Sequence, residues 1–376
     1  MHEGPFMLPF TRPTIGEDEI NAVREVLESG WITTGERARL LEHALAGYIG
    51  GGVQVKVFNS GTSALEAAFL ASGIGPGDEV IVPAMSFVAT ANVVLRVGAK
   101  PVFVDVADPG SRVLDAAGVE AAVTPKTRAV VPVHFAGLPV DMDPLYELAG
   151  KNDLIIIEDA AQAIGTTYKR RKIGASGNPV CFSFHPNKNM TTIEGGAVAA
   201  SDGSFIERAE RIRFHGIERD KNGTPNVREW GGKMNLPDVG AAIGLVQIGR
   251  LDDFNRTRRR LANRYLDRLP VHPAFVGPAD RDGHSWHMFC VCIDAGALGT
   301  TRADIQKRLA DDGIGTGIHY PAIHLFDLYR GYGYKEGDFP TAERIGEQTL
   351  TLPLFPGMTE TDVDHVCDSL DDILSG

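Results

Sequence analysis

The sequence predicts an α/β fold, in which a large domain built on a parallel or mixed sheet is followed by a smaller α+β domain. From residue 53 onward, short β-type runs alternate with helical stretches. The runs are almost continuously apolar, which is typical of strands in a sheet that helices cover on both faces. The length of 376 residues agrees with two domains, since a typical domain has roughly 150 residues.

The elements follow one another in a regular order. The expected strands are short, mainly apolar runs at 53–58, 79–82, 101–106, 129–133, 154–158, 180–184 and 196–200. Helical stretches are expected at 64–72, 88–96 and 142–150, and a long helical pattern, rich in Arg in its second half, spans 237–269. The run 287–293 and the stretch after residue 313 indicate the small domain. We therefore expect a large domain over 1–250 and a small one over 251–376, with 1–14 as a candidate to pack on the latter.

Charge and composition exclude several classes of function. The formal net charge is −12, which disfavours nonspecific binding to nucleic acids or anionic membranes but still permits a small anionic ligand. No apolar run approaches the roughly 18 residues of a membrane span, and residues 1–12 do not read as a secretory signal. The four cysteines have neither zinc nor disulfide spacing, so we expect buried thiols, a cytoplasmic location and no metal site.

The turn Asn59–Ser63 separates a predicted strand from a predicted helix. Its small residues let a ligand approach the backbone closely, and the free N–H groups of the helix start suit a phosphate. The alternative is an ordinary capped turn, because Ser and Thr are good N-caps.

An acid and a lysine follow two later strands. Asp159 lies at the end of an apolar run, where a carboxylate is costly unless it meets a cation such as a protonated ring nitrogen. Lys188 lies just after the strand 180–184, which fits a Schiff-base nucleophile. The alternatives are a helix-capping Asp and a solvated Lys.

Phosphate turn, buried acid and lysine together form the set that pyridoxal phosphate requires. The turn anchors the phosphate, the acid keeps the pyridine nitrogen protonated, and the lysine binds the aldehyde. Phe87, after another strand, is a candidate to stack on the ring, although an isolated aromatic is more often part of the core.

Several segments resemble the DegT/DnrJ/EryC1/StrS family of nucleotide-sugar aminotransferases. They occur in family order almost end to end: 8–10, 29–35, 59–65, 77–80, 86–92, 132–134, 158–162, 183–188, 313–320 and 352–356. The resemblance implies the aspartate-aminotransferase-like fold (fold type I), pyridoxal 5′-phosphate as cofactor and a homodimer with active sites at the subunit interface. It also implies amino transfer from L-glutamate to the C4 keto group of a nucleotide-linked sugar, for cell-surface polysaccharide or lipopolysaccharide.

The family's residue roles carry over position by position. Lys188 matches the lysine that binds the cofactor, Asp159 the partner of the pyridine nitrogen, and Phe87 the stacking aromatic. The remaining matches are Gly61, Thr62 and Ser63 for the phosphate turn, Ser183 for a hydroxyl to the same phosphate, Gln162 beside the phenolic oxygen, and Asn235 reaching the phosphate from the second subunit.

The nearest likeness within the family is to UDP-4-amino-4-deoxy-L-arabinose–oxoglutarate aminotransferases, although enzymes that aminate UDP-4-keto-6-deoxyhexoses share much of the pattern. Ile193 stands where many members have Gly. The segment 231–235 departs from the usual motif, so the match to Asn235 is defined only to within about two positions. A dehydratase acting on a nucleotide sugar and a noncatalytic cofactor-binding sensor stay open as alternatives. Lys188 weighs against the dehydratase branch, which has His at that position.

The residues that contact the sugar substrate are less clearly marked in the sequence than those that hold the cofactor. Candidates for the substrate cleft are Trp31, Thr33, His185, His319, Tyr320 and His324. Each histidine has the alternative of a satisfied structural residue. Arg250, Arg256 and 258–260 are candidates to face the diphosphate, although a solvated helix face explains them equally well.

Overall fold

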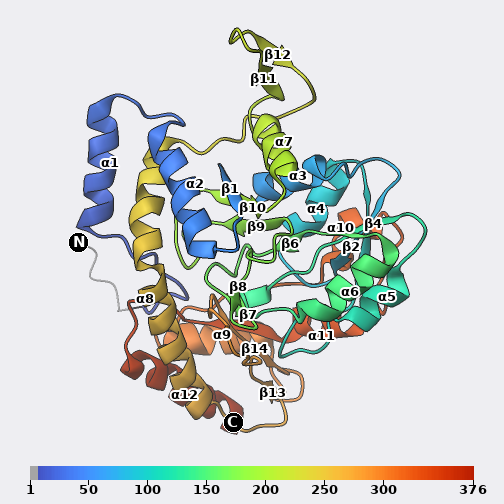
Figure 1. Cartoon of the computed structure of the whole chain (residues 1–376). Coiled ribbons are helices and arrows are strands. Elements are labelled where there is room, and N and C mark those ends of the chain that lie inside the picture. The colour runs from blue at the N-terminus through green and yellow to red at the C-terminus, as the bar shows by residue number, and fades with distance from the viewer. Residues whose placement is uncertain (1–6) are drawn as a thin grey trace.

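The computed structural model describes residues 7–376 and places a single mixed sheet at the centre of the large domain (Figure 1). Its strand order is β3 (Lys100–Val104), β2 (Glu79–Pro83), β4 (Thr127–Val130), β5 (Ile155–Ile156), β6 (Glu158–Asp159), β9 (Val180–Ser183), β10 (Gly196–Ala200) and β1 (Gln54–Phe58). β5 and β6 are consecutive pieces of the predicted strand 154–158, and a parallel bridge between Val133 and Asp159 joins the two halves of the sheet. β10 runs antiparallel to β1 and β9, whereas the other pairs are parallel.

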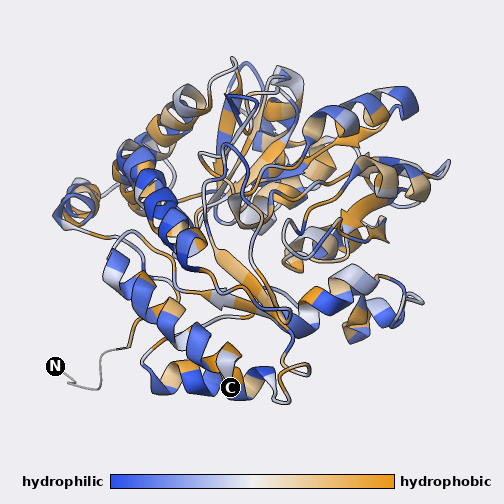
Figure 2. Ribbon diagram, turned by 90° about the horizontal axis from the view of Figure 1, so that it is seen from below, coloured by the Kyte–Doolittle hydropathy of each residue, from blue (hydrophilic) through white to orange (hydrophobic). Residues whose placement is uncertain are grey.

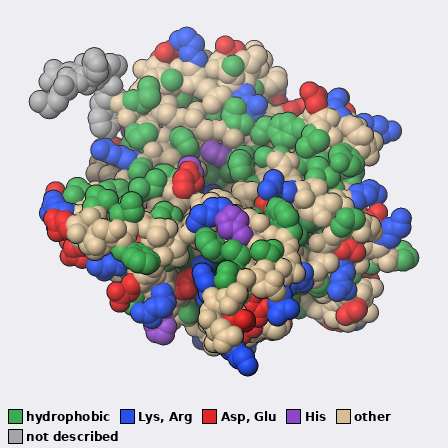
Figure 3. All heavy atoms as spheres, turned by 90° about the horizontal axis from the view of Figure 1, so that it is seen from above, with side chains coloured by type: hydrophobic (Ala, Val, Ile, Leu, Met, Phe, Trp, Pro, Cys, Tyr) green, Lys and Arg blue, Asp and Glu red, His purple; other side chains and the backbone are tan. Residues whose placement is uncertain are grey.

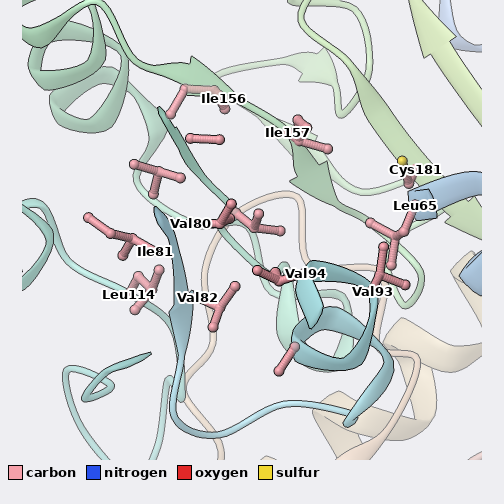
Figure 4. Packing of buried hydrophobic residues seen from close by; sticks show 14 of the residues in the cluster. Leu65, Val80, Ile81, Val82, Val93, Val94, Leu114, Ile156, Ile157 and Cys181 are labelled. Atoms are coloured by element: carbon pink, nitrogen blue, oxygen red, sulfur yellow. The ribbon is translucent and has the colours of Figure 1, made fainter. Parts of the chain in front are cut away.

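Alternating side chains of the strands enter two separate cores, which explains the apolar runs. In β9 and the residue after it, Val180, Phe182 and Phe184 belong to one core, whereas Cys181 belongs to the other. The first core packs against α2 (Glu36–Ile49) and α8 (Asp238–Arg268). Helices that cover the second are α3 (Gly61–Ala71), α4 (Ala89–Arg96), α5 (Ala116–Ala122), α6 (Met142–Asn152) and α7 (Gly203–Arg213). Figure 4 shows part of this core, where Leu65, Val93 and Val94 lie near the strand residues Val80 and Val82. Successive strand residues point to opposite faces, so both faces are buried.

A second layer of structure lies at the C-terminal end of the chain. Its sheet has the order β13 (Phe275–Val276), β14 (Phe289–Ile293), β15 (Thr349–Leu352), and the helices that share its core are α9 (Arg302–Asp311) and α12 (Glu360–Ser375). The buried residues of α10 (Asp327–Arg330) and α11 (Pro340–Gln348) belong instead to the core that contains Cys181. The backbone N–H of Leu8 donates to Gly313 O at 2.8 Å, and Leu8 is buried in the core of this layer. Helix α8 runs without a break through residue 250, where the domain boundary is predicted. Residues 1–6 of the predicted N-terminal segment lie outside the described residues.

The remaining elements lie at the surface. Helix α1 (Glu17–Ser29) packs on α8, the hairpin β7 (Thr167–Tyr168)–β8 (Arg171–Lys172) follows β6, and the hairpin β11 (Ile217–Arg219)–β12 (Pro225–Val227) projects from the body (Figure 1). The central strands are mostly hydrophobic, and the outer helices carry the hydrophilic residues (Figure 2). On the face shown in Figure 3, acidic and basic side chains are interspersed.

The four cysteines are free and buried, as the sequence predicts. Within residues 7–376, no helix combines the length and the apolar character that crossing a membrane requires.

Candidate active site

The turn between β1 and α3 has the close backbone packing that a phosphate cradle needs. The Ser60 hydroxyl caps α3 by accepting from the Ser63 N–H at 3.0 Å. A Cβ added to Gly61 would lie 2.8 Å from Ser183 Cβ, and one on Gly196 would lie 2.5 Å from the Ser60 carbonyl oxygen. Both positions therefore require glycine, and they bring the start of α3 against Ser183.

Asp159 is a buried carboxylate at the end of β6. Its Oδ2 accepts from the Thr90 hydroxyl at 2.7 Å, and its Oδ1 accepts from the Ala161 N–H at 3.0 Å. Burial raises the pKa of Asp159 above its ordinary value, while these hydrogen bonds and Lys188 act in the opposite direction. No Lys, Arg or His nitrogen of residues 7–376 lies within 4.0 Å of this carboxylate, so its charge calls for a cation that the described chain does not supply.

Lys188 lies beyond β9, on a turn in which its backbone N–H donates to His185 O at 2.8 Å. The Nζ atom is 3.5 Å from Nε2 of His287. Desolvation lowers the pKa of Lys188 to about 8, although the nearby Asp159 acts in the opposite direction. A fraction of Lys188 is therefore uncharged near neutral pH, more than for an ordinary lysine, and the uncharged amine is the form that a nucleophile or a proton acceptor needs.

One cavity of about 400 Å³ brings these groups together. Ten of the predicted site residues line it: Gly61, Thr62, Phe87, Asp159, Gln162, Ser183, His185, Lys188, His319 and Tyr320. Ser63 lies next to them in the first turn of α3. The sequence thus predicted most of the cavity wall.

Gln162 and two aromatic residues form one side of the cavity. Gln162 Oε1 accepts from the Ala136 N–H at 2.7 Å, and its Nε2 donates to the Tyr320 hydroxyl at 3.4 Å. The Phe87 and Tyr320 ring centroids are 5.6 Å apart, and Phe87 is half-exposed at the mouth. Desolvation lowers the pKa of His319 to about 4, so this ring is neutral at pH 7.

Asn235, Thr33 and Trp31 lie outside the cavity. Thr33 and Asn235 line a separate hollow of about 670 Å³, where Asn235 Nδ2 donates to the Thr34 hydroxyl. Trp31 is exposed, and its indole N–H donates to Thr34 O at 3.3 Å. The backbone of Asn235 pairs with Phe58, directly before the predicted phosphate turn, but its side chain does not line the cavity of its own chain.

His324 is a structural residue, contrary to the expectation that it faces the substrate. It is fully buried, its Nε2 lies 2.9 Å from Glu343 Oε1, and its ring packs edge-on against Phe339. Tertiary packing, which a local pattern does not reveal, makes this histidine part of the core.

The arginines expected to face a diphosphate bind other groups of the protein instead. Arg258 is buried and donates to the carbonyls of Trp286, His287 and Leu354. The others form ion pairs on the surface of α8: Arg250 with Glu19, Arg256 with Asp253, Arg259 with Asp280 and Arg260 with Glu360. The alternative of a solvated helix face fits Arg256 and Arg260, which are mostly exposed, whereas Arg250 pairs with the buried Glu19.

Two residues beside the reacting groups, Thr90 and His287, were not predicted from the sequence. Thr90 orients Asp159 across 69 positions of sequence, and His287 approaches Lys188 across 99. Thr90 follows Phe87 by one helical turn within the segment 86–92, which was the available signal. Nothing local marks His287, because its approach to Lys188 joins residues 99 positions apart.

The lowered pKa of Lys188 predicts unusual reactivity in the cofactor-free protein. Competitive acetylation, read out by mass spectrometry across pH, should show half-maximal reactivity of Lys188 near pH 8. Lys151 is a matched control, because its hydrogen bond to Glu147 raises its pKa above the ordinary value of about 10.4. Lys188 and Lys151 titrating together would contradict the desolvated environment.

The cavity fits pyridoxal phosphate on structural grounds. A phosphate suits the glycine-bounded start of α3, a protonated pyridine nitrogen would supply the cation that Asp159 lacks, and Lys188 holds an amine for the aldehyde. Ser183 would add a hydroxyl to the phosphate, Gln162 an amide beside the ring, and Phe87 an aromatic face.

Comparison with known proteins agrees with this chemistry. The chain is 40% identical to the spore coat polysaccharide biosynthesis protein SpsC of Bacillus subtilis (strain 168), over 98% of this chain and 97% of SpsC. The structure of Spr1654 from Streptococcus pneumoniae in its PLP form superposes with a TM-score of 0.91 at 30% identity, covering 98% of this chain and 99% of that one. DesV of S. venezuelae, in complex with a ketimine intermediate, superposes with a TM-score of 0.89 at 36% identity, covering 95% and 94% of the two chains.

The fold type and the cofactor predicted from the sequence are confirmed by these neighbours. Residues 13–371 match the profile of the DegT/DnrJ/EryC1/StrS aminotransferase family. The chain belongs to this family of pyridoxal-phosphate-dependent aminotransferases.

Proposed function

We propose that the protein is a sugar aminotransferase that moves an amino group from L-glutamate to the C4 keto group of a nucleotide-linked 4-keto sugar. The observation that carries the proposal is the single cavity in which Lys188, Asp159 and the start of α3 meet. The product would serve the synthesis of a cell-surface polysaccharide or lipopolysaccharide.

Bound pyridoxal phosphate supplies the aldehyde that takes up the amino group and the ring that accepts the developing negative charge. Lys188, whose lowered pKa favours proton exchange, would carry the proton between substrate and cofactor. Thr90 and the Ala161 amide hold the Asp159 carboxylate in place, and this carboxylate would pair with the ring nitrogen. The amino donor and the keto sugar would react in turn at the same site, so the same residues would serve both halves of the amino transfer.

The names of two relatives support a sugar as the acceptor. SpsC is named for spore coat polysaccharide biosynthesis, and PseC of Helicobacter pylori, with a TM-score of 0.91 at 28% identity over 98% of this chain and 99% of that one, for the biosynthesis of pseudoaminic acid. We propose a UDP-4-keto-pentose or UDP-4-keto-6-deoxyhexose as the acceptor. His185, His319 and Tyr320 at the cavity are our candidates for its contacts, with Trp31 and Thr33 on the outer surface.

We also propose a cytoplasmic homodimer with active sites at the interface. Trp31, Ile32, Phe214 and Trp230 are large apolar residues with 43–61% of their surface exposed, and Phe214 lines the same hollow as Thr33 and Thr34, so these four are our candidates for the contact between subunits. The Asn235 side chain does not line its own cavity although its backbone pairs with Phe58 beside the phosphate turn, and we propose that it reaches the cavity of the other subunit. Free, buried thiols suit a reducing compartment.

A dehydratase acting on a nucleotide sugar and a noncatalytic sensor are the competing functions. Lys188 disfavours the dehydratase, because that branch of the family has His at this position. The complete set of Lys188, Asp159 and Thr90 disfavours a sensor, which does not need a group that moves protons. The acidic net charge of −12 also disfavours a regulator that binds DNA.

A spectroscopic titration tests the function. The purified holoenzyme should be yellow, and L-glutamate should bleach its visible band. The bleached protein is then titrated with UDP-, GDP- and dTDP-linked 4-keto sugars, and a true acceptor should restore the band with formation of an amino sugar. If L-glutamate leaves the band unchanged, or if a sugar is dehydrated without gaining nitrogen, the proposed function is wrong.

A further inference from the structure

We propose that the buried pair Glu158–His134, on the face of the sheet opposite the cavity, positions the residues that hold the cofactor. Glu158 and Asp159 are consecutive in β6, so their side chains point to opposite faces. Asp159 lines the cavity, whereas Glu158 lines a separate hollow of about 250 Å³. The proposal rests on the proposed function only in that both require pyridoxal phosphate to bind.

Glu158 is held by donors from three elements. Its Oε1 accepts from the Tyr146 hydroxyl at 2.6 Å and from the Ser176 hydroxyl at 3.2 Å. Its Oε2 lies 3.0 Å from Nε2 of His134. Both residues are at least 99% buried, so this carboxylate cannot turn toward water.

The hydrogen bonds of His134 define its tautomer. Its Nδ1 accepts from the Val140 N–H at 3.1 Å, so Nε2 carries the hydrogen and donates to Glu158. The ring is thereby fixed at both nitrogens, and its orientation sets the start of the turn 134–137. The pair thus connects the far face of the sheet to this turn.

The turn 134–137 connects to three groups of the cavity. The His134 N–H donates to Asp159 O at 3.1 Å, and the Ala136 N–H donates to Gln162 Oε1 at 2.7 Å. The Ala136 carbonyl accepts from the N–H of His287, the residue beside Lys188, at 2.8 Å. A shift of this turn would therefore move the partner of the pyridine nitrogen, the amide beside the ring and the neighbour of the lysine together.

The turn needs support because its backbone is unfavourable. Ala136 has φ of 54°, in the left-handed region that costs a non-glycine residue roughly 1–2 kcal/mol, and Gly137 has φ of 91°. Neither His134 nor Glu158 lines the cavity, so neither can exchange protons with the reacting atoms directly. Their role is to hold the turn.

The test measures the dissociation constant of pyridoxal phosphate by titrating cofactor-free protein. Glu158→Ala should weaken binding by about tenfold or more, since small misplacements of binding groups are costly. Glu158→Gln retains an acceptor for His134 and should restore binding to within about threefold of the wild type.

The chain offers a matched control in a second buried pair of the same chemistry. His324 and Glu343 are 2.9 Å apart and touch no wall of the cavity. Glu343→Ala should lower the melting temperature as Glu158→Ala does, yet leave the dissociation constant of pyridoxal phosphate within about twofold, because residues without a shared partner act independently. Equal weakening by both variants, or none by Glu158→Ala, would overturn the positioning role.

A milder variant covers the case in which Glu158→Ala does not fold. Tyr146→Phe removes the 2.6 Å hydrogen bond to Glu158 without emptying the core, and should weaken cofactor binding by about threefold. Unchanged binding in Tyr146→Phe would then overturn the proposal. Amino transfer by the wild type tests the proposed function separately, so failure of one is distinguishable from failure of the other.

Discussion

Replacing Lys188 with alanine is expected to lower turnover by about 10²–10⁴-fold or more, the range for loss of a positioned proton-transfer group. Lys188 provides the amine at the cavity wall, and no other Lys among residues 7–376 lines that cavity. The phosphate cradle is built from the backbone at Gly61 and from Ser183, so the variant can still retain pyridoxal phosphate noncovalently.

Initial rates of amino transfer measure this effect, with Lys151→Ala as the control. Lys151 is an exposed lysine of α6 paired with Glu147, and its removal should leave the rate unchanged. Adding a small primary amine to Lys188→Ala should recover part of the activity if the lost function is proton transfer. A fully active Lys188→Ala would remove this residue from the reaction.

Replacing Asp159 with asparagine should lower turnover by more than about tenfold. The amide is almost isosteric and keeps an acceptor for the Ala161 N–H, but it carries no charge for a protonated ring nitrogen. A charge-assisted contact contributes roughly 1.5–3 kcal/mol, which corresponds to about 10- to 150-fold in rate.

Thr90→Val separates the orientation of Asp159 from its charge. It removes the 2.7 Å hydrogen bond to Oδ2 but leaves the carboxylate, so its loss of turnover should be smaller than that of Asp159→Asn. Steady-state kinetics of the two variants, with cofactor occupancy measured by absorbance, check this order. An unchanged rate in Asp159→Asn would exclude Asp159 from the mechanism.

The strands and the cofactor turn could be predicted from the sequence because their signals are local. Apolar runs of four to six residues mark strands buried on both faces, and Asn59–Ser63 marks a helix start by composition alone. The strand order could not be predicted in this way, because the pairing of β1 with β10 joins residues about 140 positions apart. The antiparallel direction of β10 likewise depends on its neighbours in the sheet.

Contacts between residues distant in sequence also explain why some site residues were predicted wrongly or missed. His324 and Arg258 carry the residue types of a substrate cleft, but partners far along the chain, Glu343 and the carbonyl of Leu354 among them, bury them elsewhere. Thr90 and His287 act through contacts that exist only once the sheet has formed. Motifs that are contiguous in sequence were therefore predictable, whereas residues that support them from other elements were not.

Peptide mapping of borohydride-treated holoenzyme tests the central claim most directly. Reduction makes a covalent bond between a lysine and pyridoxal phosphate permanent, so the modified residue can be identified by mass spectrometry. We predict that the added mass lies on the peptide containing Lys188, at stoichiometry near one per chain. The added mass on a different lysine, or an active yellow protein with no modified lysine, would contradict the assignment of the cavity.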